Sequence, residues 1–423
     1  MVYQPAQGYL CGTIAYMTKQ RYFFLVLILG SLTALSPFSI DMYLPAFSQI
    51  AAAMHTTVER VGLSLSSYFI GLAAGQLLYG PLLDKYGRKK PLYIGLSVYI
   101  LASFGCLSAQ SIDMLIWLRL VQAIGGCAAG VASVAMVRDL FPINENAKVF
   151  ALLMLVLGAS PMLAPTIGGF VTDALSWRVI FLILAVIAAV IFATVIFALP
   201  DKFVPNSDLS LKPLPIVLGF WDVLKVPQFY TYAFSGAISF AGLFTYVSGA
   251  PVVFMKIYHL NAKDFGLIFA GLSIGFIGFS QLNSVLLKRF KSEQIVPVAF
   301  VSQFIFGTIF LIGAAGNWIG LPFIIVMIFL QLCCIGLISP NASALSIAPF
   351  SQNAGTASSL LGATQLGIGS LATIGISSFH VVNIIPLAAV MCVAGLIACL
   401  IYFIARRGIK ESVERGVGGI VAH

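Results

Sequence analysis

Charged residues are scarce in this chain, and their scarcity excludes most soluble folds. Only 9% of the 423 residues are charged, whereas 60% are apolar. A soluble domain carries about 25% charged residues, because it has to cover its surface. A chain with so few charges is expected to keep most of its surface in lipid, and soluble domains of any size are excluded.

The residues that metal or covalent chemistry needs are also scarce. The chain has four histidines and seven cysteines, and no pair of cysteines stands at metal-ligand spacing with histidines nearby. No nucleophile constellation or phosphate-binding loop is present. We therefore expect no metal, no cofactor and no enzymatic activity. The cysteines are interpreted as small buried apolar residues.

Long apolar runs make up most of the chain. A membrane-spanning helix takes roughly 20 residues, and twelve runs of about that length or more can be read. They cover approximately 22–44, 61–83, 91–110, 113–137, 147–172, 177–199, 229–254, 264–287, 295–315, 319–347, 354–379 and 381–405. These runs predict an all-α polytopic membrane protein with twelve transmembrane helices.

A polar break divides the twelve runs into two groups of six. Residues 200–228 hold five prolines with charges between them, so we interpret them as a linker between an N-terminal half (22–199) and a C-terminal half (229–405). Within the linker, a short interfacial helix over 216–225 and a plain loop both remain possible. Residues 1–21 and 406–423 are expected to be short tails.

The distribution of cations predicts the orientation. With the N-terminus inside, 18 of the 23 Lys and Arg fall on the cytoplasmic side, as the positive-inside rule requires. Both termini are then cytoplasmic. The excess positive charge is explained by these loops, so we expect no nucleic-acid partner. Residues 1–18 do not have the pattern of a signal peptide, and Met17 is an alternative start to Met1.

The two halves look like a diverged repeat. At an offset of 204 residues, the segment 82–86 (LLDKY) aligns with 286–290 (LLKRF), and Gly71 aligns with Gly275. The match is weak by itself, but the aligned segments fall in equivalent loops of the two halves. Duplicated halves are a common plan for transporters, with the substrate site between them near the middle of the membrane.

The segment Gly80 to Pro91 is the densest group of charges between two apolar runs. It holds Asp84, a turn glycine (Gly87) and four cations that include Arg88. Asp84 is in a position to pair with Arg88 or with the Arg138–Asp139 segment at the inner end of the fourth span. Such a cluster would act as a conformational latch. The alternative is that these cations only fix the topology.

Two ionisable residues fall inside the outer halves of apolar runs. Asp41 is about 28 Å of helical rise from Tyr22, and Arg119 is about 9 Å from Asp113. Charged groups at such depths are costly and by default functional. We expect the two to face one cavity and to interact directly or through water or substrate. The alternatives are an interfacial carboxylate and an arginine that snorkels to the interface.

Polar residues near these two, and in the second half, are candidates for the substrate cavity. Tyr43 and Gln122 lie close in sequence to Asp41 and Arg119, while Asn341 and Gln365 are among the few polar residues of the second half. A cavity with one charged half and one apolar, aromatic half suits small amphiphilic organic compounds better than sugars.

The fifth span contains two prolines and many small residues. Pro161, Pro165, Gly168 and Gly169 predict a bent helix that packs closely on a neighbour. In a transporter that changes conformation this helix would be a hinge or a seal, and plain close packing is the alternative.

Together these motifs resemble the major facilitator superfamily over essentially the whole chain. Residues 80–91 look like its loop 2–3 signature, and 119–126 look like its fourth-span motif. Residues 164–169 (APTIGG) are similar to the fifth-span motif of drug:proton antiporters, with Ala164 where glycine is usual. Residues 37–45 (PFSIDMYLP) resemble the pattern of the Bcr/CflA multidrug efflux subfamily, and residues 177–181 and 355–359 fit it too.

The resemblance implies proton-coupled export of small organic compounds by alternating access, with Asp41 and Arg119 as the coupling residues. It also implies the inner membrane of a bacterium, with protons, substrate and lipid as partners, and we expect a monomer. A proton-linked transporter of a specific metabolite, such as an amino acid, is the alternative function.

Overall fold

The computed structural model describes residues 19–141, 143–200, 213–316, 318–350, 354–378 and 383–409. In these residues, twelve helical segments are long and apolar enough to cross a membrane. The described part contains helices and no strands. The predicted all-α fold with twelve transmembrane helices is therefore confirmed.

The N-terminal half consists of one span built from three consecutive helical pieces and five further spans. Its elements are α1 (Lys19–Asp41), η1 (Leu44–Ala46), α2 (Phe47–Ala53), α3 (Val58–Tyr86), α4 (Lys89–Leu107), α5 (Ile112–Leu140), α6 (Ile143–Ala174) and α7 (Trp177–Ala198). The first span is longer than predicted, because the chain stays helical beyond residue 44.

The C-terminal half repeats this plan after a short connecting helix, α8 (Pro213–Leu224). Its elements are α9 (Pro227–Pro251), the π-helix η2 (Val252–Ile257), α10 (Ala262–Leu286), α11 (Ser292–Ala315), α12 (Leu321–Ile347), α13 (Ala354–Ser378), α14 (Ile385–Ala405) and η3 (Arg406–Gly408). Of the two possibilities for the linker, the structure therefore has the helix. The boundary expected between the last two spans, at residue 380, lies outside the described residues, as do residues 1–18 and 410–423 of the two expected tails.

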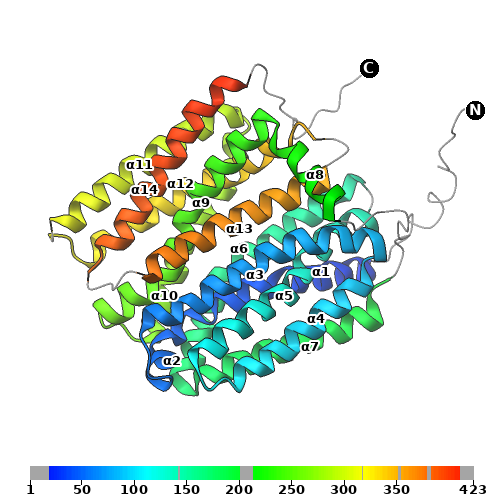
Figure 1. Cartoon of the computed structure of the whole chain (residues 1–423), viewed down its shortest axis with the longest axis horizontal. Coiled ribbons are helices and arrows are strands. Elements are labelled where there is room, and N and C mark those ends of the chain that lie inside the picture. The colour runs from blue at the N-terminus through cyan, green and yellow to red at the C-terminus, as the bar shows by residue number, and fades with distance from the viewer. Residues whose placement is uncertain are drawn as a thin grey trace, which may run out of the picture.

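The two halves lie side by side, with their helices running in roughly the same direction (Figure 1). Helix α3 packs along α13, and α6 packs along α10, so these two pairs join the halves. Arg88, Lys288 and Arg406 mark one end of the bundle, which we call the cation-rich end. In Figure 1 helix α8 lies across this end.

The backbone supports the 204-residue repeat. His55 and His259 are the two described non-glycine residues with a positive φ, at 50° and 53°. Two residues later, Thr57 and Asn261 cap α3 and α10, each accepting a backbone hydrogen bond from the residue three positions on. The same strained turn and the same cap at the same offset indicate that the two halves share one local fold.

The halves approach most closely at the end opposite the cations. A Cβ atom on Gly62 would lie 2.6 Å from the Ser377 hydroxyl, and one on Gly169 would lie 2.5 Å from the Ala262 carbonyl oxygen. Towards the cation-rich end the corresponding distances are 3.0 Å from Gly80 to the Ser359 hydroxyl and 3.3 Å from Gly362 to Gln76. Close glycine contacts therefore seal the end opposite the cations.

Candidate transport site

Arg119 lies fully buried in the middle of the N-terminal half, on α5. Its guanidinium donates hydrogen bonds to the Gln122 side-chain oxygen (2.7 Å) and to the Ser39 carbonyl oxygen of α1 (3.0 Å). The ring of Tyr68 lies 4.0 Å from it, and the ring of Tyr43 lies 4.7 Å from it. A buried cation is costly unless it is satisfied. Here aromatic faces and two acceptors provide part of that compensation, while the Arg119 Nε has no hydrogen-bond partner among the described residues.

The network around Arg119 extends to three further helices. Gln122 donates to the Ser103 hydroxyl of α4 at 2.7 Å. The hydroxyls of Ser39 and Tyr99 are 2.5 Å apart, and those of Tyr43 and Ser64 are 2.7 Å apart. These bonds connect α1, α3, α4 and α5, so the cation fixes the relative positions of most helices in this half.

Asp41 lies at the end of α1, where the halves meet. Its residue surface is 6% exposed, and its charge is close enough to act on the Tyr246 hydroxyl of α9. Tyr246 stacks on Phe269 of α10, and its hydroxyl has no hydrogen-bond partner among the described residues. The Asp41 segment therefore lies against the C-terminal half, because η1, directly after it, contacts α9 and α10.

Asp41 and Arg119 do not form an ion pair in this conformation, within the part of the chain that is described. Of the two expected modes of interaction, the direct one is therefore not present. Arg119 is instead connected to the Asp41 segment through the backbone, because its guanidinium donates a hydrogen bond to the carbonyl oxygen of Ser39, two residues before Asp41.

The four predicted cavity residues fall into separate groups. Tyr43 and Gln122 are fully buried in the Arg119 network, so they support the cation in this conformation and face no open space. Asn341 of α12 donates to the Asn283 side-chain oxygen of α10 at 2.7 Å, and Gln365 of α13 donates to the Ser343 hydroxyl at 3.4 Å. Among the described residues, no hydrogen bond joins the first two to the others.

The latch residues form a compact ion network at the cation-rich end. Arg88 donates to Asp139 of α5 at 2.6 Å and to Asp84 of α3 at 2.7 Å. Gly87 has φ 84° and ψ 169°, which glycine alone adopts readily. Gly80 lies close to Ser359 of α13. Arg138 is exposed and makes no ion pair within the described ranges.

The two carboxylates keep Arg88 charged. Burial of its guanidinium would by itself lower its pKa, but the hydrogen bonds and charges of Asp139 and Asp84 raise the pKa above the ordinary value of arginine. The predicted pairing of Asp84 with Arg88 is therefore present, and Arg88 rather than Asp84 is the centre of the network.

The fifth span (α6) packs closely at the sealed end. Gly168 lies directly against the Met42 backbone at the end of α1, and Gly169 lies against Ala262 at the start of α10. Pro161 and Pro165 both stand inside the helix, and a Cβ atom on Gly266 of α10 would lie 2.7 Å from the Pro165 carbonyl oxygen. This face of α6 thus contacts both the Asp41 segment and the other half.

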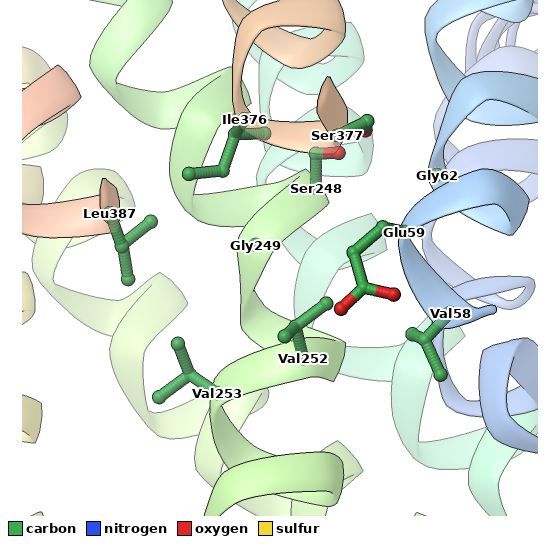
Figure 2. A pocket seen from close by; sticks show the side chains of 10 residues that line it. All are labelled: Val58, Glu59, Gly62, Ser248, Gly249, Val252, Val253, Ile376, Ser377 and Leu387. Carbon is green, nitrogen blue, oxygen red and sulfur yellow. The ribbon is translucent and has the colours of Figure 1, made fainter. Parts of the chain in front are cut away.

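An ion pair between the halves was not predicted from the sequence. Glu59 at the start of α3 accepts a hydrogen bond from Lys256 of η2 at 2.5 Å. Figure 2 shows the Glu59 carboxylate directed toward Val252 beside a small cavity. Lys256 was one of only five cations outside the predicted cytoplasmic positions, and that exception was the available signal.

The comparison with protein families identifies the chain. The family model of the Major Facilitator Superfamily matches residues 29–374. The chain belongs to the Major Facilitator Superfamily. It is therefore a membrane transporter, and the resemblance expected from the motifs is confirmed.

Similar members of the superfamily include proteins named for drug resistance. A bicyclomycin resistance protein homolog of Haemophilus influenzae is 31% identical over 93% of this chain and 100% of its own length. The multidrug resistance protein MdtL of a Shewanella strain is 27% identical over 87% of this chain and 92% of its own length. Both support the narrower resemblance to drug:proton antiporters.

A solved structure has the same superfamily fold. It is a bacterial homolog of the human lysosomal transporter Spinster, with a TM-score of 0.72 and 15% identity, and the match covers 92% of this chain and 98% of that one. At this identity the likeness supports the fold and says nothing about the transported compound.

Proposed function

We propose that this transporter exports small amphiphilic organic compounds, drugs among them, in exchange for protons by alternating access. The family membership makes it a transporter, and the resistance names of its relatives favour export of antimicrobial compounds. The observation that carries proton coupling is the position of Asp41, a buried carboxyl group at the boundary of the halves without an ion-pair partner in the described structure.

Proton binding at Asp41 changes the charge at the place where the halves touch. A buried carboxylate without a cation is expensive, whereas its neutral form is tolerated. Asp41 is joined to Met42, which packs on Gly168 of α6, and η1, directly after it, contacts α9. A change in its charge therefore acts on the contacts that seal this end of the bundle.

Arg119 is a positioning group in this mechanism. Its bond to the Ser39 carbonyl oxygen holds the last turns of α1, and its bonds through Gln122 anchor that turn to α4 and α5. The permanent guanidinium charge also favours any anion that approaches Asp41 from the boundary. The expected orientation places the cation-rich end in the cytoplasm of a bacterial cell, with the sealed end facing outward.

A matched pair of carboxylate variants tests the proposal. Asp41→Asn is expected to abolish drug-induced proton release in everted membrane vesicles, while Asp113→Asn retains it. Asp113 is an exposed carboxylate at the same end, paired with Arg60. The drugs tested are bicyclomycin and other antimicrobials of varied charge. Undiminished proton-driven export by Asp41→Asn at normal membrane levels would remove Asp41 from the mechanism.

A further inference from the structure

A groove of about 420 Å³ runs along the C-terminal half, between α10 and α11 with α12 as its floor. All but two of its lining residues are apolar. Its walls and floor include Phe279 and Leu286 of α10, Val298 and Phe306 of α11, and Leu330 and Leu337 of α12. The volume lies within the ~300–1,000 Å³ typical of sites for small molecules.

The groove opens on the lipid-facing side of the bundle. Val298 is 67% exposed, although it belongs to a membrane-spanning helix. Helix α11 packs against α12 and α14, which belong to the same half. The groove is thus separate from the contacts between the halves, where the proposed transport site lies.

The length of the groove matches one leaflet of a bilayer. The helical rise from Gln294, at the cation-rich end, to Phe306 is about 18 Å. One half of a hydrocarbon core ~30 Å thick is about 15 Å deep. A lipid chain that enters at this end can therefore follow the groove from the headgroup region to the middle of the membrane.

Cations stand at the mouth of the groove. Lys288, Arg289 and Lys291 surround Phe290, which lines the groove. Glu293 is the one acidic residue in 287–294, so this turn keeps two excess positive charges. Lys288 and Arg289 are both exposed. Basic residues that flank a membrane segment attract anionic lipid headgroups.

We propose that this groove binds an anionic phospholipid from the leaflet at the cation-rich end. An acyl chain lies between α10 and α11, and the phosphate group lies at Lys288 and Arg289. The combination of an apolar groove, one leaflet in depth, with cations at its mouth fits a lipid better than an exported drug, which has to reach the boundary between the halves. The site does not depend on which compound the transporter exports.

Charge variants test the headgroup part of the proposal. Purified transporter is titrated with phosphatidylglycerol or phosphatidylethanolamine, and bound lipid is counted by native mass spectrometry. Each lost cation is expected to weaken phosphatidylglycerol binding about fivefold, so Lys288→Gln/Arg289→Gln weakens it by roughly 25-fold in total. Binding of the zwitterionic lipid changes little.

A second double variant controls for the loss of charge alone. Arg406→Gln/Arg407→Gln removes two cations from the same end but not from the groove. Its phosphatidylglycerol binding is expected to stay within about twofold of the parent. Equal losses in the two double variants, or no loss in either, would show that the turn attracts lipid only as part of a diffuse positive surface, and would overturn the proposal.

Filling the groove tests the acyl-chain part. Val298→Trp places a large ring in the groove, and Val190→Trp places one on an exposed position of α7 in the other half. Val298→Trp is expected to lose the lipid that remains bound after extended detergent exchange, whereas Val190→Trp retains it. Full retention in Val298→Trp, with a normal gel-filtration profile, contradicts binding in the groove.

Discussion

The two halves share one repeat but pack their helices differently. Gly75 and Gly95 in the N-terminal half correspond to Phe279 and Ala299 at the 204-residue offset. A Cβ atom on Gly75 would lie 2.5 Å from the Cβ of Cys127, and one on Gly95 would collide with Ala128. The larger counterparts line the groove of the C-terminal half. At these two positions glycine lets the helices of the N-terminal half pack closely, whereas the larger residues of the C-terminal half border the groove between α10 and α11.

The halves also differ in what they bury. Gln122 bonds to Ser103 in the N-terminal half, and Gln331 lies against Gly307, the residue 204 positions after Ser103. Counted from this contact, which is shifted by five residues from the 204-residue offset, Gln331 takes the place of Gln122, and Ile328, which is also fully buried, takes the place of Arg119. One half is organised around a cation and the other around apolar side chains, so the charge-dependent steps are assigned to the N-terminal half.

Removing the buried cation should give the largest difference between the halves. Arg119→Met leaves the Gln122 side-chain oxygen and the Ser39 carbonyl oxygen without their donor, at about 1–3 kcal/mol for each buried group. Transport is expected to fall by about 100-fold or more, and thermal unfolding to begin at a lower temperature. Drug efflux and differential scanning fluorimetry measure the two effects.

The matched change in the other half is Gln331→Leu. The Gln331 amide is buried and has no partner among the described residues, so replacing it with an apolar side chain of similar size costs little. If Gln331→Leu impaired transport as much as Arg119→Met, the division of roles between the halves would be wrong.

The glycine contacts provide the second test. Gly95→Val forces a branched side chain into Ala128 and the Gly125 carbonyl oxygen, and overpacking of this kind typically costs ~1–3 kcal/mol. We expect a clear drop in the amount of folded protein. Gly278→Val is the control, because no atom lies within 4 Å of a Cβ at that position. Similar yields of the two variants, measured by fluorescence-detected gel filtration, would contradict tight packing in the N-terminal half.

The sequence predicted the spans and the ionisable residues because both depend on composition. Long apolar runs and rare charges within them are visible without coordinates, and this is why Asp41, Arg119 and Arg88 could be proposed as candidates from the sequence. The grouping of polar side chains was harder to predict. Gln122 and Asn341 both read as cavity residues, but rotation about a helix axis decides whether an amide faces a cavity or a neighbouring helix.

Contacts between distant segments were not predictable in the same way. Tyr246 looks like any other tyrosine in an aromatic-rich span, and only the packing of α9 against η1, directly after α1, brings it near Asp41. Glu59 and Lys256 are separated by 197 residues, so no local pattern joins them. The groove beside α11 lies where the C-terminal half has larger residues at positions that are glycine in the N-terminal half. This difference is apparent only when the two halves are aligned at the 204-residue offset.

The equivalent loops of the two halves give the third test. Arg88→Gln breaks the bonds to Asp84 and Asp139, and charge-assisted bonds contribute about 1.5–3 kcal/mol each. The Asp139 carboxylate is 20% exposed and that of Asp84 is 57% exposed, so most of the effect comes from Asp139. We expect about a tenfold loss of turnover with little change in drug binding.

Lys288→Gln is the control for this loop, because Lys288 occupies the position that Asp84 has in the repeat and has no carboxylate bonded to it in the described structure. Its turnover should stay within about twofold of the parent. Equal losses of binding and turnover in Arg88→Gln would argue against a latch, since a latch affects the conformational change and leaves the affinity of each state unaltered.

The ion pair across the boundary should give the smallest effect. Lys256 is 46% exposed while Glu59 is nearly buried, so solvent screening limits their interaction to the order of 1 kcal/mol. Glu59→Gln should therefore shift the balance between sealed and open states only about fivefold.

The probe for this shift is a cysteine introduced at Ser377, which lies beside Gly62 at the sealed end. The rate of its reaction with a membrane-impermeant thiol reagent is measured. Lys256→Met should increase that rate similarly, and the double variant should add nothing further. Additive effects would mean that each residue acts through other neighbours, and the closure of this end would then depend on the glycine contacts alone.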